Sequence, residues 1–115
     1  MYSIPQMLQG AFDFKGEGYS EITFLGENLR YVVPEGKRAQ AVYLRAGNSC
    51  NEMVAVVLLR NGTPMRYFPI GAKGTSHVAL AVVEDLQSGD VVDVCASAPL
   101  ASSGTIIIDF GLVQI

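Results

Sequence analysis

The sequence predicts an all-β protein: a small antiparallel β-sandwich of jelly-roll type, with about eight strands and an extended N-terminal arm. Three observations carry this prediction. Short apolar runs recur at a spacing of roughly 8–12 residues, and most of them alternate apolar with polar side chains. Glycine, proline and asparagine separate the runs in the combinations that tight turns require. No segment of the 115 residues shows a sustained helical period.

The predicted strands follow one another from residue 20 to the end of the chain. They span residues 20–25, 29–33, 39–46, 53–60, 65–70, 77–86, 91–97 and 105–115. Pro34-Glu35-Gly36 ends the second strand, because proline presets one backbone angle of a turn and glycine supplies a positive φ. Asn61-Gly62 is the strongest hairpin signal in the chain and joins the fourth strand to the fifth. Pro69 indicates that the fifth strand lies at a sheet edge.

Segment 77–86 is the one element whose type is ambiguous, since its composition also suits a helix. Val78, Leu80 and Val82 lie on one face at a period of two residues, and Gly74 and Gly89 bound the run. We therefore expect a strand.

Residues 1–19 form the predicted arm, and residues 20–115 form the sandwich domain. Three glycines and the lack of a sustained period favour an extended segment over a packed element. Phe12 and Phe14 point to the same side of an extended chain, so together with Tyr19 they are candidate contacts with a neighbouring subunit or another protein. An arm that folds back over its own sandwich would use Phe12 and Phe14 equally well.

Strands 53–60, 77–83 and 105–115 are apolar on both faces, whereas one face of an antiparallel sandwich normally contacts water. Coverage by loops is one explanation, and a subunit interface is the other. A domain of this length buries only roughly 60–70% of its unfolded surface, which favours the interface. The predicted subunit interface comprises Val54, Val56, Leu58, Ile106, Ile108 and Phe110.

Composition excludes several classes of protein. Half of the residues are hydrophobic and 17% are charged, which is too apolar for a disordered chain. No run of about 20 apolar residues could cross a membrane as a helix. The net charge of −3, with scattered lysines and arginines, argues against nucleic-acid binding. With no secretory signal in the sequence, Cys50 and Cys95 are expected to be reduced thiols.

Chemistry-bearing motifs are scarce, so no enzyme activity, cofactor or resident metal is predicted. His77 is the single histidine, no Gly-x-Ser-x-Gly motif accompanies it, and we expect it to be exposed or bonded within a turn. The acidic group of Glu84, Asp85, Asp90 and Asp93 leaves two alternatives open. The group holds Ca²⁺ in a loop, or Asp90 accepts backbone hydrogen bonds in its turn while the others face solvent.

Residues 31–115 resemble a phage structural β-sandwich family through four short motifs. These motifs read Tyr31-Val32-Val33-Pro34-Glu35-Gly36-Lys37, Leu86-Gln87-Ser88-Gly89-Asp90, Cys95-Ala96-Ser97-Ala98 and Gly111-Leu112-Val113-Gln114-Ile115. The segment 56–94 is also similar to the trimeric C1q/tumour-necrosis-factor jelly roll, through its strand, Asn-Gly turn, strand and Leu-x-x-Gly-Asp turn.

The resemblance implies a virion protein that is made in the host cytoplasm and lies on the capsid exterior. We expect a capsid decoration (cement) protein that forms a homotrimer, binds the major capsid protein and stabilises the shell, with no nucleic acid or membrane as partner. The alternative is a head- or tail-fibre module that recognises a host surface glycan through an exposed loop at 71–76 or 98–104. No trimeric shaft, collagen repeat or heptad precedes the sandwich in this sequence, which favours the decoration protein.

Overall fold

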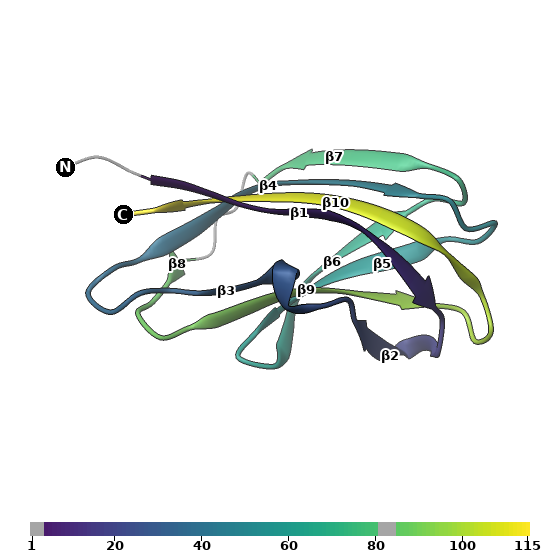
Figure 1. Ribbon diagram of the computed structural model, residues 1–115, viewed down its shortest axis with the longest axis horizontal. Coiled ribbons are helices and arrows are strands. Elements are labelled where there is room, and N and C mark those ends of the chain that lie inside the picture. Colours follow the sequence, from purple (N-terminus) through teal and green to yellow (C-terminus); the bar gives the residue numbers. More distant parts are fainter. Residues whose placement is uncertain (1–3, 81–84) are drawn as a thin grey trace.

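The computed structural model describes residues 4–80 and 85–115 and confirms the predicted fold class. Two five-stranded antiparallel sheets pack face to face in a sandwich (Figure 1). Sheet A has the order β1 (Ile4–Lys15), β10 (Ser103–Gln114), β4 (Ala39–Asn48) and β7 (Thr75–Ala79), and β8 (Asp85–Leu86) also pairs with β4. Sheet B has the order β2 (Gly18–Phe24), β9 (Val91–Ala98), β5 (Val54–Arg60) and β6 (Thr63–Ile70), and β3 (Arg30–Val32) also pairs with β9. A single 3₁₀ turn, η1 (Glu27–Leu29), precedes β3.

The predicted turns hold where the structure describes them. Asn61 and Gly62 both have positive φ angles, 52° and 81°, and close the β5–β6 hairpin with two residues. Gly36 and Gly89 likewise take positive φ in the turns that precede β4 and β9. β6, which contains Pro69, lies at one edge of sheet B, as predicted.

The arm predicted for residues 1–19 is wrong for the part of it that the structure describes. β1 pairs with β10 in continuous antiparallel register, from Ile4 opposite Gln114 to Lys15 opposite Ser103 (Figure 1). Gly10 interrupts the alternating pattern by which a strand is recognised in the sequence. The Phe12 ring explains the glycine, because a Cβ atom on Gly10 would lie only 2.6 Å from Cζ of that ring. The chain then leaves sheet A and enters sheet B as β2. Residues 1–3 lie outside the described range.

The prediction of a strand over 77–86 is confirmed at residues 77–79 and 85–86, whereas Leu80 lies outside the strands. β7 covers the start of the segment and β8 its end, while residues 81–84 lie outside the described range. β4 pairs with both strands, so they lie along the same edge of sheet A.

The six residues predicted for the trimer interface form part of the core instead. Val54, Val56, Leu58, Ile106, Ile108 and Phe110 are each at most 1% exposed and belong to one buried cluster. This cluster draws on both sheets, so these side chains interdigitate within a single chain and cannot meet a second copy. The prediction failed because a strand that is apolar on both faces does not reveal which face points inward.

The acidic residues near β8 and β9 point to separate partners rather than to a common cation. Asp85 accepts a hydrogen bond from Gln40, Asp93 pairs with Arg30 at 2.7 Å, and Asp90 pairs with Arg60 at 2.7 Å. Asp90 also accepts the backbone N–H of Gln87 in its turn, which confirms the second alternative for that residue. Glu84 lies outside the described residues, and no group of three or more metal-ligating side chains occurs among the others.

Two further predictions can be compared with the structure. Cys50 and Cys95 are both buried and free, in agreement with the expected thiols. Within residues 4–80 and 85–115, no helix has the length and apolar character needed to span a membrane.

Candidate functional site

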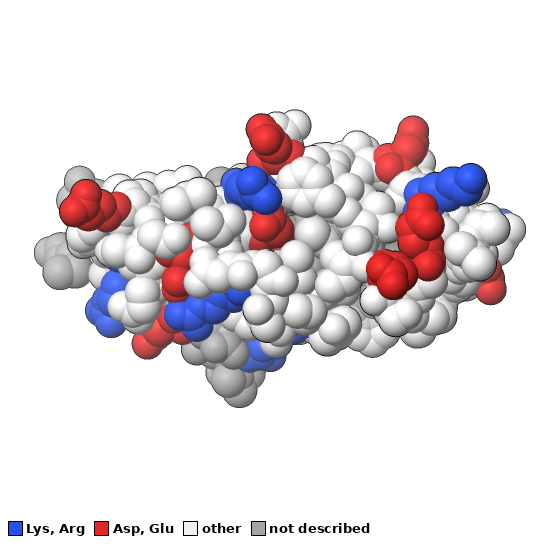
Figure 2. Space-filling model, turned by 90° about the horizontal axis from the view of Figure 1, so that it is seen from below, with Lys and Arg blue, Asp and Glu red and all other residues white. Residues whose placement is uncertain are grey.

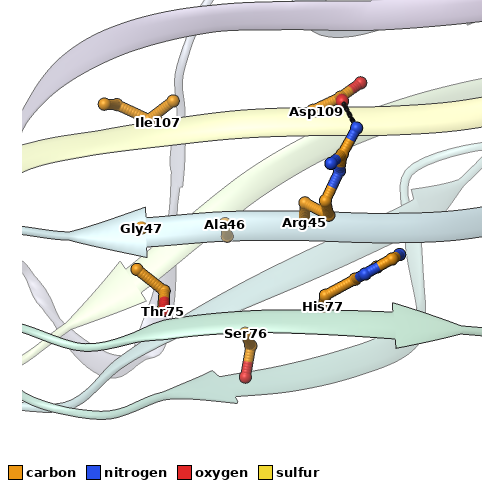
Figure 3. Close-up of a pocket in the computed structure, with 8 residues that line it drawn as sticks. All are labelled: Arg45, Ala46, Gly47, Thr75, Ser76, His77, Ile107 and Asp109. Atoms are coloured by element: carbon orange, nitrogen blue, oxygen red, sulfur yellow. Dashed lines mark hydrogen bonds and ion pairs between the residues drawn. The ribbon is translucent and has the colours of Figure 1, made fainter.

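A pocket of about 380 Å³ opens on the outer face of sheet A, where β10, β4 and β7 lie side by side (Figure 3). Six residues supply most of its wall and rim: Arg45, Gly47, Thr75, His77, Ile107 and Asp109. The lining is mostly carbon, with charged groups at one end. We call this feature the sheet A pocket.

Strand register explains how the sheet A pocket arises from three distant segments. Asp109 lies opposite Arg45, which lies opposite His77, and this forms one polar row across the sheet. Two residues along, Ile107 lies opposite Gly47, which lies opposite Thr75, and this forms an apolar row. Side chains alternate along each strand, so both rows face outward while Ala46 and Ser76 between them face the other way (Figure 3).

Asp109 is the centre of the hydrogen-bond network at the polar end. Its carboxylate accepts hydrogen bonds from Gln9 Nε2 at 3.0 Å, Tyr43 Oη at 2.8 Å and an Arg45 guanidinium nitrogen at 2.9 Å. Burial alone raises the pKa of this carboxyl, but the three donors outweigh burial and leave its pKa below the ordinary value. Asp109 is therefore ionised at neutral pH and acts as a hydrogen-bond acceptor.

Tyr43 supports the network from the neighbouring position on β4. Its ring lies across Gly111, where an added Cβ atom would be 2.0 Å from the ring's Cε2. The His77 ring meets the Tyr43 ring edge-on at a centroid distance of 6.1 Å, and the Arg45 guanidinium lies 5.5 Å from the Tyr43 centroid. Burial and the hydrogen bond to Asp109 raise the pKa of Tyr43, so its hydroxyl stays protonated and donates.

The outer face of sheet B carries a second feature, a row of side chains across four strands. The strand register pairs these residues one after another: Phe24 on β2 with Cys95 on β9, Cys95 with Val57 on β5, and Val57 with Tyr67 on β6. Cys95 and Val57 are at most 1% exposed, whereas the flanking Phe24 and Tyr67 are 49% and 60% exposed. We call this row the sheet B face.

The surroundings of the sheet B face add apolar area and little charge. Tyr19 on β2 donates a hydrogen bond to the Met53 carbonyl at 2.8 Å, so its side chain spans β9, and both residues are more than 40% exposed. The Arg30 guanidinium lies 5.3 Å from the Phe24 ring centroid and is held by Asp93. Figure 2, which views the molecule from below, where Figure 1 places β2, β3 and β9, shows broad uncharged areas between small groups of charges.

Cys95 contributes packing rather than reactivity to the sheet B face. Burial, together with the nearby charge of Asp93, raises its pKa to about 11. Its thiol is therefore protonated at neutral pH and is a poor nucleophile.

The predicted contact residues Phe12, Phe14 and Tyr19 do not lie on a free arm, because the first two belong to β1 and the third belongs to β2. Phe14 is 7% exposed in the core, and Phe12 packs against the same core. Of the two alternatives for this pair, folding back over the same sandwich is the one observed. Tyr19 is exposed and lies beside the sheet B face.

Sequence reasoning did not single out Arg45, Tyr43 and Asp109 as functional residues. The only available signal was their position on the polar phase of strands 39–46 and 105–115. His77 is exposed, as predicted. The last two residues of the loop singled out at 71–76, Thr75 and Ser76, lie in β7 instead, and from there they line the pocket.

Comparisons with known proteins support the fold and leave the function open. No family model matches the chain, and no curated protein matches it in sequence. Among solved structures, a family 35 carbohydrate-binding module from Clostridium thermocellum is similar over 95% of this chain and 97% of its own, with a TM-score of 0.51 and 14% identity. The insecticidal delta-endotoxin Cry8Ea1 from Bacillus thuringiensis aligns with 96% of this chain and 18% of its own at 10% identity, with a TM-score of 0.46.

Proposed function

We propose that the protein is a non-enzymatic structural component of a virion, a capsid decoration protein that binds the outer shell as a homotrimer and stabilises it. The observation that carries this proposal is the sheet B face, where the aromatic side chains of Phe24 and Tyr67 remain about half exposed. Exposed aromatic side chains are enriched at protein interfaces relative to the rest of a protein surface. The motif resemblance to phage structural sandwiches supplies the virion context.

The dimensions of the molecule are compatible with self-association through this face. The chain measures 46 × 23 × 22 Å, so one long side offers about 1,000 Å², against about 800 Å² per partner in a standard interface. The proposed trimer contact therefore consists of the outward side chains of β2 and β6, in place of the buried side chains of β5 and β10 that the sequence predicted. The capsid contact then falls on surfaces that the trimer leaves free, the outer face of sheet A among them.

Charge introduced into the sheet B face is expected to dissociate the trimer. The double variant Phe24→Glu/Tyr67→Glu would place two carboxylates in each buried contact, at a cost of at least about 2 kcal/mol for each central aromatic residue lost. Light scattering at micromolar concentration should give three times the 12.3 kDa of one chain for the wild type and one chain mass for the variant.

The matched control carries the same added charge on exposed apolar residues elsewhere. Met7→Glu/Leu100→Glu changes one residue on the outer face of sheet A and one in the β9–β10 turn, which are 56% and 74% exposed. This control should remain trimeric. A monomeric wild type, or equal dissociation of both double variants, would refute association through the sheet B face.

The second candidate function is a fibre module that recognises a host surface glycan. The sheet A pocket favours it, because an apolar wall beside fixed donors and acceptors suits an amphipathic ligand. One solved structure with a similar fold is a carbohydrate-binding module, and this likeness extends to the fold alone.

A further inference from the structure

We propose that the sheet A pocket binds the pyranose ring of a neutral saccharide. This inference rests on the second candidate function, glycan recognition, and does not depend on capsid decoration. The argument uses the two rows of side chains that meet in the pocket, one apolar and one polar.

The apolar row provides a surface for the C–H face of a sugar ring. Gly47 has no side chain, so the backbone of β4 is open at this point and forms a shallow floor. Ile107 stands on one side of it and Thr75 on the other (Figure 3). The Thr75 methyl group is 3.5 Å from the position that a Cβ atom on Gly47 would occupy, so any larger residue would narrow this floor.

The polar row provides a donor and an acceptor at a fixed separation. An Arg45 guanidinium nitrogen and Asp109 Oδ2 are 2.9 Å apart, and Gln9 and Tyr43 hold the other carboxylate oxygen in place. Two vicinal hydroxyl groups of a pyranose have oxygens at a similar spacing, so one can donate to Asp109 while the other accepts from Arg45. The His77 imidazole lies beside this pair at the pocket rim.

Charge balance in the pocket favours a neutral sugar over an acidic one. The Arg45 charge is offset by the ion pair with Asp109, whose carboxylate is held ionised by its three donors. A sugar carboxylate placed at this rim would meet the Asp109 carboxylate as well as the Arg45 cation. A ring with uncharged hydroxyl groups meets no such repulsion.

Nuclear magnetic resonance of the full ¹⁵N-labelled chain tests the proposal with methyl glycosides of glucose, galactose, mannose and N-acetylglucosamine. At least one of them should shift the amide signals of Arg45, Gly47, Thr75, His77 and Ile107, with a dissociation constant on the order of 1 mM for a single ring. Saturation at about 20 mM should then follow from this constant.

Two variants probe the two rows, and a third is the matched control. Gly47→Val fills the floor, and Arg45→Gln removes the guanidinium donor while Asp109 keeps its bonds from Gln9 and Tyr43. Each should weaken binding by about ten-fold or more. Ala11→Val adds similar bulk on the same outer face, on the far side of Ile107 from Gly47, and should bind as the wild type does.

The outcomes separate this inference from the function on which it rests. Binding that both variants weaken and the control retains supports the pocket. Binding that neither Gly47→Val nor Arg45→Gln weakens overturns the assignment of the pocket and leaves glycan recognition standing at another place. No binding of any glycoside at about 20 mM overturns the pocket and counts against the glycan candidate, while the trimer measurement is unaffected.

Discussion

Replacing Ile108 by alanine is expected to lower the free energy of unfolding by about 2–5 kcal/mol, the range for removing a large aliphatic side chain from a packed core. Ile108 is 1% exposed and belongs to the buried cluster between the two sheets. The loss combines the transfer energy of the deleted carbons with the cavity left behind, because the neighbouring strands cannot collapse fully. Urea denaturation followed by circular dichroism measures the change.

Ile107→Ala is the matched control, since the adjacent residue has the same side chain and points to the opposite face. Ile107 is 59% exposed, and its truncation should change stability by no more than about 0.5 kcal/mol. Both substitutions should be measured in the Phe24→Glu/Tyr67→Glu background, where the chain is expected to be monomeric. If Ile108→Ala were harmless in the monomer, Ile108 would be an interface residue and the assignment to the core would be wrong.

Gly16→Ala is expected to destabilise the chain by about 3 kcal/mol, at the upper end of the range for overpacking. Gly16 joins β1 to β2, and a Cβ atom there would lie 2.1 Å from the Pro99 carbonyl oxygen and 2.9 Å from the Ala98 carbonyl oxygen. The Gly16 N–H donates to the Ser102 carbonyl at 2.7 Å, which holds this junction against the β9–β10 turn. Because two of the three obstructing atoms are backbone oxygens, the third being Ser102 Oγ, relief requires two chain segments to separate.

Gly71→Ala is the control for Gly16→Ala. A Cβ atom on Gly71 would meet nothing within 4 Å, and its φ is not positive, so alanine should be neutral or stabilising by up to about 1 kcal/mol. Thermal unfolding monitored by circular dichroism compares the two variants directly. A Gly16→Ala protein as stable as Gly71→Ala would contradict the close approach of Gly16 to the β9–β10 turn.

Local signals in the sequence predicted most of the strands and turns. The Asn61-Gly62 hairpin and the Pro34 and Gly89 turns depend on backbone preferences of a few adjacent residues, which are legible without knowledge of the partner strands. β1 was missed for the opposite reason. Gly10 interrupts its alternating pattern, and its stability comes from β10, about 100 residues away in the chain.

The candidate site was less predictable because it depends on register between distant strands. Arg45 and Asp109 are 64 residues apart, and they meet only because β4 and β10 pair at that point. The core was misassigned for a related reason. In β10, three consecutive isoleucines at 106–108 leave the inward phase undetermined, and only the structure shows that the middle one faces outward.

Counting this chain against the major capsid protein tests the decoration proposal most directly. The measurement is gel densitometry, with purified standards, on purified particles of the virus to which the proposal assigns the chain. The proposal predicts on the order of hundreds of copies per particle, in a fixed ratio to the shell protein, because a symmetric lattice offers equivalent sites over its whole surface. About a dozen copies would contradict decoration and favour a fibre or tail module. Absence from the particle would contradict both.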